Sequence, residues 1–319
     1  MKKMTRKLLL SILTVVLTVI VLGTTTFAWF TITNVATVQA YDADLKANEG
    51  IEIALGAVPL AGPDQLNWVT NLTAATIEEY IFTNLANEPE GFKFDHVTSA
   101  NGRNFFTLFA GDTGYEQTAT TAGYIELPLH FRSDTADGID WTGLSLTSTP
   151  LAWNTDVSFI NVGDVTPTAV GTLLSVDPTD SVRISFTGSV LVETVATTVT
   201  TVFEKPAQGD NVVLGTGGDL SNGGLGLAGA MNYFYAKNGV LPIGAAAVSV
   251  PLAITTVGTI RILDMTLNAD PESLDYAGAD YYGSVLVRIW IEGWDANAYN
   301  AILGGTISTS MEFTGATIA

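Results

Sequence analysis

Carboxylates are the side chains of this sequence that could do chemistry, and two loops concentrate them. The longer loop, 268–280, contains Asp270, Glu272, Asp275 and Asp280, and the shorter loop, 176–181, contains Asp177 and Asp180. Loops rich in side-chain oxygens suit a hard cation such as Ca²⁺. Asp270, Asp275 and Asp280 are therefore candidate ligands of a structural calcium ion, although the spacing of an EF-hand is absent. The alternative is that these carboxylates are solvated surface groups, as most charged side chains are.

The sequence shows no group of residues typical of a catalytic centre. It has no cysteine, and its two histidines, His96 and His130, lack the spacing of metal ligands. The HExxH and GxSxG motifs are absent. Two carboxylates across a cleft could cleave a glycosidic bond, but nothing in the sequence selects such a pair. We therefore expect a protein that is not an enzyme and that needs no cofactor.

Four tryptophans raise the alternative of a sugar-binding surface: Trp141, Trp153, Trp290 and Trp294. In the alternating segment LVRIWIEGW, however, a tryptophan is expected to pack on a second face of the strand rather than to stack on a ligand. The glycine-rich stretch 215–230 lacks the Lys-Ser/Thr of a phosphate-binding loop. We expect this stretch to be a flexible surface loop.

The charge balance excludes several classes of partner. The chain has 13 Lys and Arg against 32 Asp and Glu, a formal net charge of −19, and four of the cations lie in its N-terminal stub. Nucleic acid and anionic membrane surfaces both attract basic patches, so neither is an expected partner. Because cysteine is absent, no disulfide can form. Core burial must hold the fold, and help from bound cations or neighbouring subunits stays open.

Alternation of apolar and polar residues predicts strands in several parts of the chain. The residues expected to face the core are Ile125, Leu127, Leu129 and Phe131; Val182, Ile184 and Phe186; Leu263, Met265 and Leu267; Val285, Val287, Ile289 and Ile291; and Ile307, Thr309, Met311 and Phe313. Pro128 predicts an edge position for its strand, because proline cannot donate a ladder hydrogen bond. Helices are expected only at 73–86 and 295–305. The pattern predicts an all-β fold, a jelly-roll or Greek-key β-sandwich with short helices in connecting loops.

The N-terminus predicts export. A cationic stub, MKKMTRK, precedes the apolar run LLLSILTVVLTVIVLG, and small residues follow around Ala28. This order is typical of a signal peptide that signal peptidase removes. The run up to Phe30 is also long enough to span a bilayer, so an uncleaved transmembrane anchor is the alternative. Either way, residues 1–28 are expected to be the only part that contacts the membrane, and the rest to be extracellular or on the cell surface.

The segment after the signal resembles the N-terminus of one group of secreted bacterial proteins, the TasA/camelysin group. The similarity lies in TFAWFTITNVATVQAYDADLKANEGIEIAL, with an aromatic start at Phe30, a polar strand-like run, and the strand GIEIAL at 50–55. The chain reads FTITN where that group has an FSDxE-like run, and its spacing to Gly50 is longer. More broadly, HFRS, VRISFT and VRIWIEGWDANAYNAILGGTISTSMEF resemble exported "AWFT" proteins of Firmicutes and Mollicutes, many of which have a cysteine where this chain has Ala298.

The TasA-like resemblance implies a jelly-roll domain that assembles into extracellular fibres, in which the segment freed by cleavage adds as a strand to the next subunit. Residues 29–45 would be this docking strand, residues 46–319 the β-sandwich, and the intersubunit contacts would be Phe30, Ile32, Val35 and Val38. A head-to-tail contact of this kind does not close, so it gives filaments. Two alternatives stay open. In the first, residues 29–45 form the first strand of their own sandwich and do not dock on another subunit. In the second, the protein is an adhesin or a carbohydrate-binding module on the same sandwich.

Overall fold

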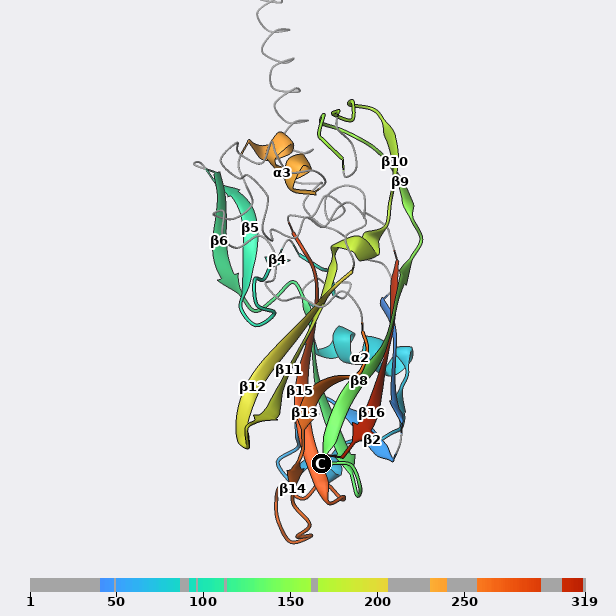
Figure 1. Ribbon diagram of the computed structural model, residues 1–319, viewed down its shortest axis with the longest axis vertical. Coiled ribbons are helices and arrows are strands. Elements are labelled where there is room, and N and C mark those ends of the chain that lie inside the picture. Colours follow the sequence, from blue (N-terminus) through green and yellow to red (C-terminus); the bar gives the residue numbers. More distant parts are fainter. Residues whose placement is uncertain are drawn as a thin grey trace, which may run out of the picture. The chain divides into compact units, whose positions relative to one another are not determined.

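The computed structural model describes nine segments of the chain, all of them in the larger of its two units. They are residues 41–48, 50–86, 92–95, 97–111, 114–161, 166–205, 230–239, 257–293 and 306–317. Most of these residues form β-strands and few form helices, so the all-β fold class is confirmed (Figure 1). The predicted signal segment, the helix expected at 295–305 and residues 215–229 of the glycine-rich stretch lie outside the described residues.

The first of two large sheets joins the two ends of the described chain. Its strands, in spatial order, are β13 (Ile260–Asp264), β8 (Gly138–Ser148), β16 (Ile307–Ala316), β1 (Tyr41–Asn48) and β3 (Asn71–Leu72). Its pairings are antiparallel except the one between β1 and β16, which run parallel from Tyr41 opposite Ile307 to Asn48 opposite Thr314. The first described strand therefore lies beside the last.

The second large sheet is antiparallel. Its strands, in spatial order, are β12 (Val195–Glu204), β11 (Val182–Val192), β15 (Tyr281–Ile291), β7 (Ile125–Ser133) and β2 (Ile51–Leu55), and the short β14 (Thr266–Leu267) also pairs with β15. The chain passes from the first sheet into the second directly after β1. Gly50 lies at this passage with a φ of 75°, a left-handed conformation that glycine adopts without strain.

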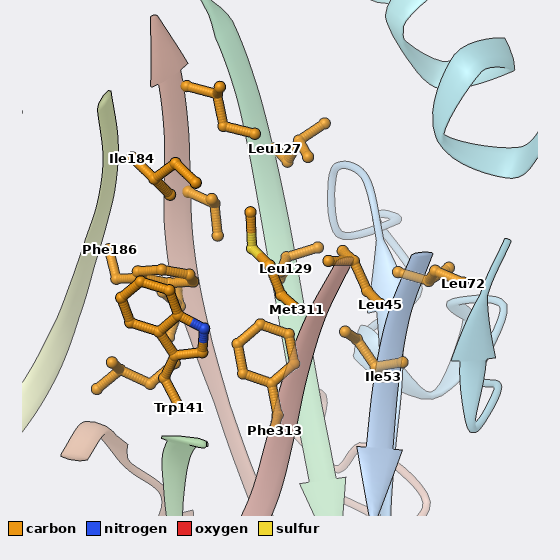
Figure 2. Packing of buried hydrophobic residues seen from close by; sticks show 14 of the residues in the cluster. Leu45, Ile53, Leu72, Leu127, Leu129, Trp141, Ile184, Phe186, Met311 and Phe313 are labelled. Atoms are coloured by element: carbon orange, nitrogen blue, oxygen red, sulfur yellow. The ribbon is translucent and has the colours of Figure 1, made fainter. Parts of the chain in front are cut away.

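The facing sides of the two sheets share one hydrophobic core (Figure 2). Trp141 of β8 packs against Phe186 of β11 with ring centroids 4.5 Å apart. Phe313 of β16 packs against Phe131 of β7 with centroids 5.2 Å apart. Each contact joins a strand of the first sheet to a strand of the second. This face-to-face packing is the arrangement expected of a β-sandwich.

Alternation identified the core positions of most strands. The residues predicted to face the core are buried on β7, β11, β15 and β16. The prediction was wrong for Leu267, whose side chain is 61% exposed. The run that reads as one strand is two, since β13 pairs with β8 and β14 pairs with β15. Because the chain changes sheets between Asp264 and Thr266, the alternation does not continue through this point.

The edge position predicted from Pro128 was wrong, since β7 pairs with β15 on one side and with β2 on the other. The position of the proline along the strand explains why it is tolerated. β2 ends at Leu55, and the carbonyl of Pro128 accepts a hydrogen bond from the N–H of Gly56 at 3.0 Å. A strand residue turns its N–H and C=O to the same side. The missing donor therefore falls where the partner strand has ended.

Smaller elements flank the two sheets. They are the three-stranded sheet of β4 (Val97–Thr98), β5 (Phe105–Gly111) and β6 (Gly114–Thr120), the pair of β9 (Leu151–Asn154) and β10 (Leu173–Val176), the 3₁₀ turns η1 (Pro63–Gln65) and η2 (Pro178–Ser181), and the helices α2 (Ala74–Asn84) and α3 (Ala230–Asn238). Helix α2 confirms the helix predicted at 73–86, and the Thr73 side chain accepts from the N–H of Thr76 as its N-cap. Within the described ranges, no helix is long and apolar enough to cross a membrane.

Candidate functional site

The three calcium candidates do not form a metal site. Asp270 and Asp275 are exposed in the loop before β15, and Asp280 is half-buried. The Asp270 carboxylate accepts a hydrogen bond from the N–H of Glu272 at 3.1 Å, which closes a local turn. Among the described residues, no three His, Cys, Asp or Glu side chains come close enough together to hold a metal ion. The Asp270 carboxylate therefore acts as a turn-forming group, and that of Asp275 is a surface group.

The second acidic loop does enclose a cation, and that cation is a lysine. The Nζ atom of Lys205, just after β12, lies 2.8 Å from the Asp177 carboxylate and 2.7 Å from that of Asp180. Burial raises the pKa of Asp177, but hydrogen bonds from Lys205, Ser148 and Thr179 outweigh it and lower the pKa to about 2. The pKa of Asp180 is raised, because the effect of burial exceeds the lowering of the pKa by Lys205. The ammonium group takes the place that a bound cation would need.

A second group of buried charges lies beside this loop, on the strands of the second sheet. Arg183 of β11 stands opposite Glu204 of β12 and opposite Trp290 of β15. Its side chain is 1% exposed, and its Nε atom lies 3.2 Å from the Glu204 carboxylate. Its guanidinium also donates to the carbonyl of Asp180 at 2.9 Å. This contact joins the two groups of charges into one buried cluster.

Glu292, directly after β15, brings a second carboxylate to Arg183. Its side chain is 2% exposed and accepts a hydrogen bond from the Trp290 indole N–H at 3.0 Å. Burial raises the pKa of Glu292 to about 7, against the opposing effects of Arg183, Thr98 and Trp290. Arg183 therefore faces two carboxylates. Glu292 is the one whose raised pKa, about 7, favours the protonated, uncharged form. The group around Lys205 is similar, because there too one cation pairs with two carboxylates.

This cluster was not predicted, because charged residues that alternate with apolar ones along a strand are also typical of a solvated face. That face is covered at this end of the sheet by a small cluster of buried apolar residues, which are Val97, Phe105, Tyr124, Val202 and Trp290. The Phe105 ring packs edge-on against Trp290 with centroids 5.1 Å apart. The packing expected for Trp290 is thus confirmed. Its place in the outward set of an alternating strand was the signal that a further layer covers the sheet.

Of the four tryptophans that suggested a sugar-binding platform, the three that the structure describes are buried. Trp141 and Trp290 are 0% exposed, and Trp153 is 9% exposed beneath α3, where its ring contacts Tyr233. Trp294, the histidine His96 and the four predicted docking residues Phe30, Ile32, Val35 and Val38 lie outside the described residues. Of the predicted docking strand 29–45, residues 41–45 are described, and they belong to β1 in the first sheet.

His130, on β7, is buried, and each of its two ring nitrogens has a hydrogen-bond partner. One ring nitrogen, Nε2, lies 2.8 Å from the carbonyl oxygen of Gly56, and Nδ1 lies 2.8 Å from the hydroxyl oxygen of Tyr282. Because a carbonyl can only accept, Nε2 carries the hydrogen and Nδ1 accepts from the tyrosine. Burial lowers the pKa of His130, and the Gly56 carbonyl only partly opposes this. The ring is therefore a neutral bridge between two strands and a loop.

We expect His130 to make the protein less stable in acid. As the pH falls through about 6.5, the unfolded chain takes up a proton that the folded histidine resists, so the free energy of unfolding declines. A His130→Gln variant should lack this contribution to the decline. Urea unfolding of both proteins at pH 7.5 and 5.5 measures the difference between them. A His130 NMR signal that titrates at or above the ordinary histidine pKa would contradict the expectation.

The end of the β11–β12 hairpin extends past the point where β11 stops pairing with β15 (Figure 1). β11 pairs with β15 only as far as Thr187 but with β12 as far as Val192. We call residues 188–198 the hairpin arm. Three of its apolar side chains, Leu191, Val192 and Val195, are 45%, 50% and 63% exposed. The arm therefore presents apolar surface beyond the body of the sheet.

β12 is an edge strand with few of the usual protections. Within the described part of the chain, β11 is the only strand that pairs with it. Edge strands are commonly protected by charged residues, proline or a bulge. From Val195 to Phe203, β12 instead reads VATTVTTVF, which is uncharged and rich in β-branched residues. Such a strand is suited to accept another strand along its free side.

Two charged side chains bind the backbone of the hairpin arm. Its turn, Glu193–Thr194, has φ values of 49° and 70°, as in the two-residue turns whose flanking residues exchange both hydrogen bonds. It follows that Ala196, Thr198 and Thr200 turn their backbone groups away from β11. The guanidinium of Arg103 donates to the carbonyl of Thr198 at 2.9 Å, and the Asp264 carboxylate accepts from the N–H of Leu191 at 2.5 Å. These contacts satisfy backbone groups that another strand would otherwise use.

Comparisons with known proteins give no relative: no family model, no curated protein and no solved structure matches this chain.

Proposed function

We propose that this protein is an extracellular structural subunit of a surface or biofilm-matrix fibre, exported by its N-terminal signal and assembled by strand addition. In this proposal, signal peptidase frees the segment that begins near Trp29, and the jelly-roll or Greek-key sandwich of one subunit receives that segment from the next. The observation that carries the proposal is the parallel pairing of β1 with β16.

This pairing supports strand addition because a strand from another copy could take the place of β1 beside β16. Among the described residues, β3 covers the outer side of β1 at Leu45 and Lys46 alone, with one further hydrogen bond from the N–H of Ala47 to the carbonyl of Thr70. Along the chain, the predicted docking segment 29–45 ends within β1. A short connection at Gly50 separates β1 from β2 in the other sheet. An N-terminal strand of another copy could therefore pair with β16 in the same way.

Filament formation tests this proposal. We expect the chain beginning at Trp29 to form filaments visible by negative-stain electron microscopy. Aspartate at both Phe30 and Ile32 should abolish them, because charged residues oppose burial in a subunit contact. Aspartate at Thr31 and Thr33 is the matched control, since in an extended strand these residues alternate with Phe30 and Ile32. Monodisperse particles at high concentration, with or without calcium, would contradict the proposal.

The second candidate, an adhesin or carbohydrate-binding module, has less support. Three of the four tryptophans that suggested a sugar platform are buried. Trp68 is half-buried, with the Arg132 guanidinium 4.7 Å from its ring centroid and its indole N–H donating to the carbonyl of Pro63. This candidate predicts a monomer whose retention on a glycan array falls when Trp68 is replaced by alanine.

A further inference from the structure

We propose that two copies of this chain join through the free edges of their β12 strands, so that the second sheet continues from one copy into the other. This contact is symmetric, and it is independent of the head-to-tail contact of the proposed fibre. It begins from the hairpin arm, whose outer backbone groups are paired only by side chains among the described residues.

Charge favours a second copy over a charged partner. The chain has a formal net charge of −19, so most approaches between two copies are repulsive. β12 has no charged residue from Val195 to Phe203, and the side chain that reaches its outer backbone is the cation Arg103. Two β12 strands can therefore meet without placing carboxylates opposite one another. A basic partner would be attracted to the acidic loops instead.

The strand is also complementary to itself. In an antiparallel pair around a two-fold axis, residues that turn their backbone groups outward must face one another. On β12 these are the even-numbered residues, so an axis through Thr197 places Ala196 opposite Thr198 of the second copy. Val195 then faces Val199. Threonine and valine are favourable cross-strand neighbours, and the exposed Val195 side chain loses contact with water.

The arm extends far enough for this contact. Beyond Thr187, β11 has no pairing with β15, and the side chains from Val195 to Thr198 are exposed on β12. Pairing replaces the hydrogen bond between Arg103 and the Thr198 carbonyl with one from a backbone N–H of the second copy. Arg103 therefore sets the strength of the contact, because its bond must be given up first.

The absence of cysteine allows a sharp test. In the full chain, kept in mild detergent because of its apolar N-terminal run, Thr197→Cys introduces the only thiol. Residues on the axis form a pair without ladder hydrogen bonds, about 4.5 Å apart at Cα, which suits a disulfide. We expect oxidation to give a covalent dimer with Thr197→Cys and little dimer with Val195→Cys or Val199→Cys. Val170→Cys, 63% exposed elsewhere, is the control for random collision.

Two further variants test the mechanism. Thr198→Lys should suppress the covalent dimer formed by Thr197→Cys at least tenfold, whereas Thr147→Lys, on an exposed position of β8, which is paired on both sides, should not change it. Arg103→Ala should increase association about tenfold, since a charge-assisted hydrogen bond no longer competes. Circular dichroism establishes that each variant is folded.

Three outcomes would overturn the pairing. One is the absence of covalent dimer with Thr197→Cys, and another is an equal yield with Val170→Cys. The third is crosslinking of Thr197→Cys to a Thr33→Cys chain in preference to itself, which would assign the edge to the N-terminal segment of a neighbour. Filaments without a covalent dimer at residue 197 would support the fibre proposal and contradict the β12 pairing. Covalent dimers without filaments would support the β12 pairing and contradict the fibre proposal.

Discussion

Replacing Arg183 by methionine should lower the free energy of unfolding by about 3–5 kcal/mol at pH 8. Methionine keeps much of the buried volume but removes the cation that faces Glu204 and Glu292. Both carboxylates then remain buried, at 4% and 2% exposure, in a region that water does not reach. The loss should be smaller at pH 5, because protonation of Glu292 removes part of the uncompensated charge. Urea unfolding at both pH values measures it.

A matched variant separates the effect of a buried ion pair on stability from the effect of an exposed one. Arg132 of β7 pairs with Glu52 at 2.7 Å, but that glutamate is 41% exposed. Arg132→Met should therefore cost only about 1 kcal/mol, with little dependence on pH. The double variant Arg183→Met with Glu204→Leu should recover much of the stability that Arg183→Met loses, because the pair is removed together. Equal losses for the two arginines would contradict a special role of the buried cluster.

Replacing Glu292 by glutamine should stabilise the protein at pH 8 by up to about 3 kcal/mol. The folded-state pKa of this carboxyl is about 7, above its ordinary value of 4.5. Between these pH values the folded protein keeps a proton that the unfolded chain has released. The free energy of unfolding of the unaltered protein therefore falls as the pH rises from about 4.5 to about 7. Above this range the loss is complete, and glutamine avoids it.

The test compares unfolding curves at pH 5, 6, 7 and 8. The difference between Glu292→Gln and the unaltered protein should grow across this range and then level off. Glutamine can still accept the hydrogen bond from Trp290, so the packing of the indole is kept. A constant difference at all four pH values would show that Glu292 is ionised throughout. His130 acts in the opposite direction with pH, so only differences between proteins are informative.

The sequence predicted the fold class and the main core face because alternation is a local property. Phe131, Phe186 and Phe313 occupy the positions that their strands' patterns assigned, and the structure brings them together from three distant segments. The Leu267 error shows the limit of the pattern. Alternation gives the two faces of a strand, but it does not say where a chain leaves one sheet for another.

The buried charges were missed for a related reason. Arg183 and Glu292 alternate with apolar residues, which is also the pattern of a solvated face. Their burial depends on β4 and β5, which cover this end of the sheet from elsewhere in the sequence. The pairing of Asp177 and Asp180 with Lys205 was likewise hidden, because the lysine follows a hairpin that separates it from the loop. Local acidity suggested calcium, and the tertiary partner is an ammonium group.

The parallel pairing of β1 with β16 also constrains the order in which the sheet can form. The first sheet cannot gain β1 in its final place until the last strand has emerged, because β16 lies between β1 and β8. Contacts between such distant parts of a chain form slowly, and the chain stays open until they do. In the proposed export, the chain crosses the membrane from its N-terminus and passes through as an incomplete sheet. Strand β1 is then outside before β16 can pair with it, which is the period when the proposed neighbouring subunit could bind.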